Sequence, residues 1–260
     1  MAVKAGLFLF LPEIILAMMR KFLLVLTGSL LLLISATAQP VPKYKLLFRK
    51  GIEMKKINLL PEAMSFFKRS LSLNKNFDSV YAEIGKLYLN QGKTDSAIFN
   101  LNKAITINPK MVETQIVLGN LYRDTKSNID SALVYYFNAL KIDSLNKVTL
   151  YSIAWCYNAK KDYEKVFPYA IKALSVDNTY RPAYGEMAHA YRNTKKFAEA
   201  VEQFKNYFTV TPPIDLPYFY SGLCYTELNQ KENAMKMYDE LQKINPKMAE
   251  NLKKKIDALK

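Results

Sequence analysis

The side chains that could do chemistry are few in this 260-residue chain. It has one histidine, His189, one tryptophan, Trp155, and two cysteines, Cys156 and Cys224. A single histidine excludes every metal site that needs two imidazole ligands. Two cysteines are too few for a disulfide framework, and we expect them to be small core residues. The sequence therefore predicts no resident metal and no cofactor.

Catalysis is disfavoured by the absence of any sequence motif that would support it. The chain has no Gly-rich phosphate loop, no metal cluster and no nucleophile elbow. Ser152, His189 and nearby acids could be drawn as a triad, but their spacing does not support one. We expect no catalytic residue, no enzymatic activity and no small-molecule substrate.

A second group of side chains suits recognition instead. Tyr151 precedes Trp155 by four residues, which is one helical turn, and His189 follows Trp155 by 34 residues. Arg192 comes three residues after His189. Because Trp, Tyr and Arg dominate binding hot spots, these residues would make a partner-binding surface if the fold placed them together.

The elements that must position them belong to an internal repeat. A small residue recurs at intervals of 34, 34, 35, 34 and 34, at Gly51, Gly85, Gly119, Ala154, Ala188 and Gly222. An aromatic residue follows three places later in five copies, at Tyr88, Tyr122, Tyr157, Tyr191 and Tyr225. An alanine recurs further along each copy, at Ala63, Ala97, Ala132, Ala200 and Ala234, with Val166 in the fourth. A period of this length indicates an array of stacked units.

The pattern resembles the tetratricopeptide repeat, a pair of antiparallel helices of 34 residues. The resemblance implies an all-α, right-handed solenoid with six repeats, at 44–77, 78–111, 112–146, 147–180, 181–214 and 215–248, closed by a capping helix over 249–260. The small residues would let the two helices of a repeat approach closely, and the aromatic residues would fill the gaps between neighbouring repeats. Pro168 lies inside the second helix of the fourth repeat and predicts a kink there.

In this family the first helices line a concave groove, so the resemblance also implies which positions face a partner. The candidate partner-binding residues are Asn120, Arg123, Tyr151, Trp155, His189, Arg192 and Phe219. The family's two-carboxylate clamp needs a lysine three residues before the small residue, and no repeat has one. The mixed aromatic and polar groove suits an extended or helical segment of another protein. The alternative for Trp155 is that it only packs against the neighbouring repeat.

The first 38 residues predict an export signal. Arg20 and Lys21 precede an apolar run at 22–34, and an A-x-A pattern ends at Ala38, where we expect cleavage. The run is short for a bilayer span of roughly 20 residues, which makes an uncleaved anchor the weaker alternative. The separate apolar stretch 1–17 favours a translation start at Met18 or Met19. We expect an exported chain, in the periplasm, the cell envelope or the medium, with 39–43 as a short linker.

The net charge of +14 raises the alternative of nucleic-acid binding. Helical-repeat RNA readers use polar side chains to bond base edges, whereas this chain places Phe48, Ala82 and Ile116 at the corresponding positions. The export signal also points away from nucleic acid, so we expect no nucleic-acid partner.

The positive charge is concentrated near the start of the repeats. Residues 43–75 carry a net +7, whereas 76–246 carry only +2. The basic end comprises Lys43, Lys45, Arg49, Lys50, Lys55 and Lys56. It could bind an anionic envelope surface or polymer, or simply keep an exposed terminal helix soluble.

Overall fold

The computed structural model describes residues 18–23, 40–209 and 214–259. Residues 1–17 and the expected cleavage site near Ala38 lie outside these ranges. Within them the secondary structure is helical, and no strand occurs. The chain divides into two compact units, Met1–Leu73 (unit 1) and Asn74–Lys260 (unit 2).

Unit 1 contains one helix pair, α2 (Lys43–Lys56) and α3 (Leu60–Leu73). Phe67 is fully buried against Gly51, and a Cβ added at Gly51 would lie 2.4 Å from Cε1 of Phe67. The Ser70 hydroxyl donates to the Tyr44 carbonyl at 2.7 Å, which ties the end of α3 to the start of α2. Most of the basic end is exposed on α2, at Lys43, Lys45, Arg49, Lys50 and Lys56, while Lys55 is half-buried.

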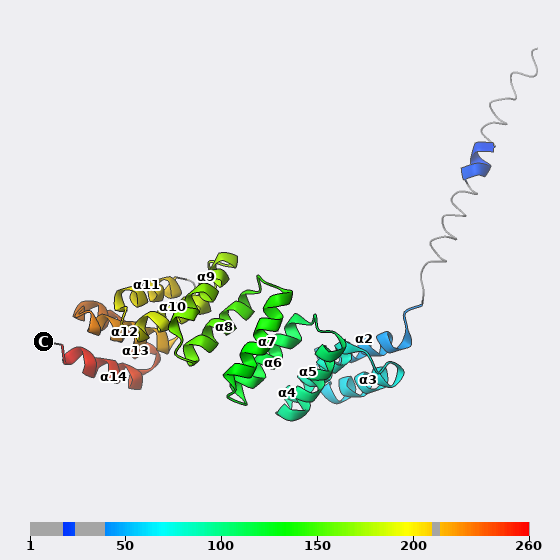
Figure 1. Ribbon diagram of the computed structural model, residues 1–260, viewed down its shortest axis with the longest axis horizontal. Coiled ribbons are helices and arrows are strands. Elements are labelled where there is room, and N and C mark those ends of the chain that lie inside the picture. Colours follow the sequence, from blue (N-terminus) through cyan, green and yellow to red (C-terminus); the bar gives the residue numbers. More distant parts are fainter. Residues whose placement is uncertain (1–17, 24–39, 210–213, 260) are drawn as a thin grey trace, which may run out of the picture. The chain divides into compact units, whose positions relative to one another are not determined.

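Unit 2 is a run of helix pairs, each packed on the next (Figure 1). The pairs are α4 (Asp78–Asn90) with α5 (Thr94–Ile107), α6 (Val112–Asp124) with α7 (Ile129–Ile142), α8 (Lys147–Ala159) with α9 (Val166–Val176), α10 (Arg181–Asn193) with α11 (Phe197–Phe208), and α12 (Asp215–Glu227) with α13 (Lys231–Ile244). A last helix, α14 (Pro246–Asp257), packs on α12 and α13. The expected all-α stack of helix pairs is confirmed, although α14 begins earlier than residue 249.

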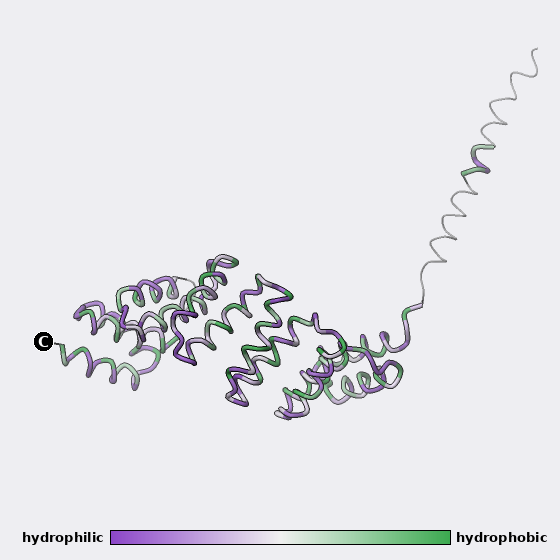
Figure 2. The backbone as a smooth tube through the Cα atoms, in the orientation of Figure 1, coloured by the Kyte–Doolittle hydropathy of each residue, from purple (hydrophilic) through white to green (hydrophobic). Residues whose placement is uncertain are grey.

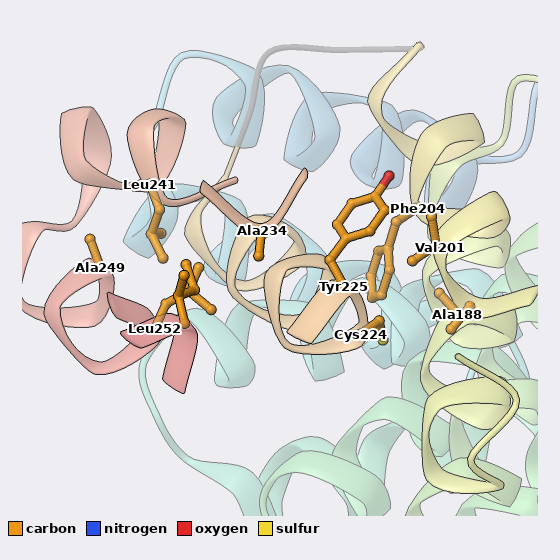
Figure 3. Packing of buried hydrophobic residues seen from close by; sticks show 11 residues of the cluster. Ala188, Val201, Phe204, Cys224, Tyr225, Ala234, Leu241, Ala249 and Leu252 are labelled. Atoms are coloured by element: carbon orange, nitrogen blue, oxygen red, sulfur yellow. The ribbon is translucent and has the colours of Figure 1, made fainter. Parts of the chain in front are cut away.

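The core of unit 2 is a series of local clusters. Each combines side chains of neighbouring helices: α5 with α6, α7 with α8, α8 with α9 and α10, and α10 through α14. Hydrophobic and hydrophilic residues alternate along the helices, as amphipathic packing requires (Figure 2). At the C-terminal end Leu252 and Ile256 of α14 are fully buried, and Leu252 packs among the side chains of the neighbouring helices (Figure 3). The capping role expected of this helix follows from that burial.

The recurring glycines make room for a large side chain. A Cβ at Gly85 would lie 2.7 Å from Cγ of Leu101, and one at Gly119 would lie 2.5 Å from Cε1 of Tyr136. Both large residues come from the second helix of the same pair. The small residues thus let the two helices of one pair approach closely, while the signature aromatic residue Tyr88 packs against the cluster formed by α5 and α6. Close packing against Gly85 offsets the roughly 1 kcal/mol that glycine costs inside a helix.

Each turn between paired helices uses one residue in the left-handed region, at Asn58, Gly92, Ser127, Lys161, Lys195 and Asn229. In four of these turns the next residue donates its backbone N–H to the carbonyl of the signature aromatic residue five places earlier, as when Lys93 N–H donates to the Tyr88 carbonyl at 2.9 Å. This is the Schellman pattern, which satisfies carbonyls that the end of a helix would leave unpaired. The repeat therefore conserves a turn geometry although its residue type varies.

The predicted kink at Pro168 is wrong. A 3₁₀ turn (Tyr163–Lys165) precedes α9, which begins at Val166 and is 11 residues long. Pro168 is then the third residue of the helix, where the backbone N–H has no intrahelical partner to lose. The proline shortens the α-helix instead of bending it.

Candidate functional site

A cavity of about 560 Å³ opens among α8, α10, α11 and α12 in unit 2. Its walls are mostly apolar, with the aromatic residues Tyr151, Trp155, Phe204, Tyr207 and Tyr220. Pro182, Ile214, Leu216 and Pro217 complete the apolar lining. A concave, largely apolar site of this size with a few polar groups is typical of a ligand pocket.

Gly185 on α10 contributes to this space. A Cβ added there would lie 3.5 Å from Cε2 of Tyr207, which is an ordinary van der Waals contact. At Gly119, by contrast, the space is filled by Tyr136. The missing side chain at Gly185 therefore leaves room beside the cavity.

Four of the seven sequence-predicted groove residues line the cavity: Tyr151, Trp155, His189 and Arg192. They come from the first helices of adjacent pairs, α8 and α10, because the 34-residue period places corresponding positions side by side. Tyr151 and Trp155 are half-buried.

The other three predicted groove residues lie outside the cavity lining. The Arg123 guanidinium lies over the Trp155 ring, 4.9 Å from its centroid, and donates two hydrogen bonds to Asp124 at 2.6 and 2.9 Å. Asn120 Oδ1 accepts from the Tyr136 hydroxyl at 2.6 Å. Phe219 packs against the cluster of α10 through α14. Arg123 thus supports the Trp155 ring, Asn120 bonds a buried tyrosine, and Phe219 contributes to the core.

Asn158 and Glu186 are among the cavity residues that were not selected from the sequence. Asn158 Nδ2 donates to the Glu186 carbonyl at 2.9 Å and to its Oε2 at 2.6 Å. Both positions carried a signal, because Asn158 directly follows the signature aromatic residue and Glu186 lies one helical turn before His189. This hydrogen-bonded pair joins α8 to α10 at the cavity wall.

Burial shifts the pKa values of two side chains that line the cavity, Glu186 and His189. It raises the pKa of Glu186 to about 7, although the hydrogen bond from Asn158 and the charge of Arg123 act in the opposite direction. Burial, together with the nearby charge of Arg192, lowers the pKa of His189 below its ordinary value. Near neutral pH the imidazole is therefore neutral and Glu186 is only partly ionised.

Two guanidinium groups lie at the aromatic wall. Arg192 sits over the Tyr220 ring, 4.0 Å from its centroid, and Arg181 sits over the Tyr207 ring at 4.9 Å. With Glu186 only partly ionised, these two cations make the lining positive. Arginine stacked on an aromatic ring keeps its N–H donors in the plane of the guanidinium, where they suit carboxylates.

Two buried polar atoms of the cavity residues have no hydrogen-bond partner, Oδ1 of Asn158 and Nε of Arg192. Asn158 is 6% exposed. An unpaired buried polar atom costs on the order of 1–3 kcal/mol, so such atoms are uncommon in folded proteins. Both atoms belong to residues that line the cavity.

The candidate metal ligands and the two thiols lie apart from the cavity lining, except for Glu186 and His189. In the part of the chain that the structure describes, no three His, Cys, Asp or Glu residues are grouped so as to hold a metal ion. Cys156 and Cys224 are buried free thiols, and burial raises their pKa values to about 12 and about 11. The Ser152 hydroxyl donates to the Val148 carbonyl at 2.8 Å.

None of the helices in residues 18–23, 40–209 and 214–259 combines the length and apolarity that a bilayer crossing needs.

Family models described as Tetratricopeptide repeat match three parts of the chain, 78–111, 182–213 and 218–247. The second and third matches contain nearly all of α10, all of α11 and α13 and most of α12, and therefore part of the cavity wall.

Individual relatives are distant. Anaphase-promoting complex subunit 3 of Schizosaccharomyces pombe is 21% identical over 198 residues, which are 76% of this chain and 30% of that protein. This chain therefore spans under a third of the length of that relative.

Solved structures show the same fold. PilW, a type IV pilus biogenesis factor, superposes with a TM-score of 0.68 at 15% identity, over 82% of this chain and 99% of that one. YrrB, described as a TPR protein with an unusual peptide-binding site, gives 0.61 at 20% identity, over 72% and 97% of the two chains. At these identities the likeness concerns the fold alone.

Proposed function

Because the chain belongs to the tetratricopeptide-repeat family, we propose that it is an interaction scaffold that holds a segment of another protein in the cavity of unit 2. The observation that carries this proposal is the gathering of Tyr151, Trp155, His189 and Arg192 around one cavity of about 560 Å³. Aromatic and arginine residues at a concave site are the usual centre of a protein-binding surface. The role is binding, with no chemical step assigned to any side chain.

In this proposal an apolar side chain of the partner enters between the aromatic walls, and polar groups of the cavity set its register. Trp155 is suited to be the central contact because it is half-buried and Arg123 holds its ring from behind. Asn120, Arg123 and Phe219 then act indirectly, through the packing of the residues that line the cavity.

We further propose that the chain is exported and that residues 1–38 are removed. The basic and apolar pattern before Ala38 supports export. The partner would then be a protein of the cell envelope.

The test is affinity capture of partners by residues 39–260 and by its variant Trp155→Ala. We expect the variant to weaken binding by about 2 kcal/mol, or roughly 30-fold, with unchanged helicity. Phe99→Ala is the matched control, because Phe99 is 69% exposed on α5 and lies outside the cavity. A large fall in melting temperature for Trp155→Ala alone would show that this residue is core, and would refute its assigned role.

The second candidate function is binding of an anionic envelope surface by the basic end. It is favoured by the exposure of Lys43, Lys45, Arg49, Lys50 and Lys56 along one helix. A variant with these residues and Lys55 changed to Gln separates the two functions. Loss of anionic lipid or polymer in that variant, with protein partners retained, would assign the surface role to α2.

A further inference from the structure

The charges of the cavity narrow the class of partner. Arg181 and Arg192 are cationic, His189 is neutral at pH 7, and Glu186 is the single carboxylate among the described lining residues. Asn158 already donates a hydrogen bond to Glu186 at 2.6 Å. The site thus has an excess of positive charge beside an apolar wall.

The hydrogen bonding of the Arg192 guanidinium is incomplete. The group rests on Tyr220, and its Nε is buried without a hydrogen-bond partner. Arg123, the other predicted groove arginine, has both a stacked ring and two bonds to Asp124. A guanidinium carries Nε and one terminal nitrogen side by side, so that the two can donate together to two oxygen atoms. That fork is the geometry that carboxylates match.

We infer that the cavity selects a partner segment in which an Asp or Glu side chain lies next to an aromatic or large aliphatic residue. The carboxylate bonds Arg192, and the neighbouring apolar side chain fills the space between Trp155 and Tyr207. A donor of the same segment pairs Oδ1 of Asn158. This inference rests on the proposed function and gives it a ligand chemistry: an internal acidic residue, with no requirement for a free C-terminus.

The experiment begins with a library of random dodecapeptides displayed on phage, selected on the full 260-residue chain. Display joins each peptide to coat protein at its C-terminus, so the selection does not depend on a terminal carboxylate. The expected consensus has Asp or Glu within two residues of Phe, Tyr, Trp, Leu, Ile or Met. The Trp155→Ala chain serves as the counter-selection bait.

A consensus peptide with an amidated C-terminus, labelled with fluorescein, is then titrated by anisotropy. We expect Arg192→Lys to weaken binding about tenfold, because lysine keeps the charge and loses the fork. Replacing the acid of the peptide by its amide should cost a similar factor. The two losses should not add, because both remove the same contact. Circular dichroism checks that each variant stays folded.

Lys205→Ala is the control at a cationic side chain outside the cavity. Lys205 is exposed on α11, is paired with Glu202 at 3.2 Å and lies outside the cavity lining, so binding should stay within about twofold. Enriched peptides without an acidic residue, or equal losses for Arg192→Lys and Lys205→Ala, would overturn the inference while leaving the scaffold role intact. Absence of enrichment over the Trp155→Ala bait would overturn the proposed function as well.

Discussion

Two glycines on corresponding helices should respond in opposite ways to the same substitution. Gly119 lies within α6 and Gly185 within α10, and alanine is favoured over glycine inside a helix by about 1 kcal/mol. At Gly119 the new Cβ would lie 2.5, 2.8 and 2.9 Å from three ring atoms of Tyr136. At Gly185 it would lie 3.5 Å from Tyr207, at ordinary contact.

The ring of Tyr136 has little freedom to retreat. It is fully buried, and its hydroxyl is bonded to Asn120 at 2.6 Å. Overpacking of this kind costs about 1–3 kcal/mol, so after the helix gain of about 1 kcal/mol Gly119→Ala should destabilise the chain by up to about 2 kcal/mol. Gly185→Ala should instead be neutral or stabilising by up to about 1 kcal/mol. It also adds a methyl group beside the cavity and should weaken partner binding.

The assay is thermal unfolding followed by circular dichroism, with amide hydrogen exchange to locate the change. Exchange is needed because arrays of repeats depart from two-state unfolding. We expect faster exchange in α6 and α7 for Gly119→Ala, and no loss of protection in α10 for Gly185→Ala. If Gly119→Ala stabilised the chain as much as Gly185→Ala, the explanation of the recurring glycines as space for a large side chain would be refuted.

Three further predictions concern the cap, the buried carboxyl and the thiols. Leu252→Ala should cost about 2–5 kcal/mol, because Leu252 is fully buried in α14, and hydrogen exchange should show loss of protection in α12 through α14 while α4 through α7 stay protected. Glu186→Gln should stabilise the chain at pH 8 by about 1–3 kcal/mol and have no such effect at pH 4, as measured by melting at both values. The reason is that the pKa of the Glu186 carboxyl is 4.5 in the unfolded chain and about 7 in the folded chain. Between these pH values the folded chain binds more protons than the unfolded chain, so its stability falls as pH rises from about 4.5 to 7. Equal melting shifts at both pH values would contradict this prediction. Cys156 and Cys224 should not react with iodoacetamide at pH 8 until denaturant is added, because burial keeps both protonated, and labelling of the native chain detected by mass spectrometry would count against this.

The fold could be predicted because the repeat pattern occurs six times in the sequence. A small residue, an aromatic residue three places later and an alanine further on are local signals, and stacking repeats them at a fixed period. The same period predicted that Trp155 and His189 share a surface, since the first helices of adjacent pairs lie side by side. The repeat period was therefore sufficient to predict which residues lie on one face of the array.

The rest of the site depends on choices that periodicity does not encode. Arg123 contacts both Asp124 and the Trp155 ring, and this arrangement, which keeps it out of the cavity lining, depends on the packed structure. Part of the cavity wall comes from α11 and α12, where Tyr207 and Leu216 line one cavity only because two helix pairs stack on each other. Pro168 was misjudged for a related reason, since the start of a helix can shift to accommodate a proline.

The arrangement of the core into local clusters has a mechanical consequence. Each cluster joins neighbouring helices, so a load applied along unit 2 would be borne at the junctions between pairs, while the helices stay intact. The cavity spans the two junctions between α8 and α12. A bound segment would contact the helices on both sides of these junctions, and would raise the stiffness of this part of the array relative to α4 through α7. Force spectroscopy of the chain would therefore register an occupied cavity as a change in elasticity.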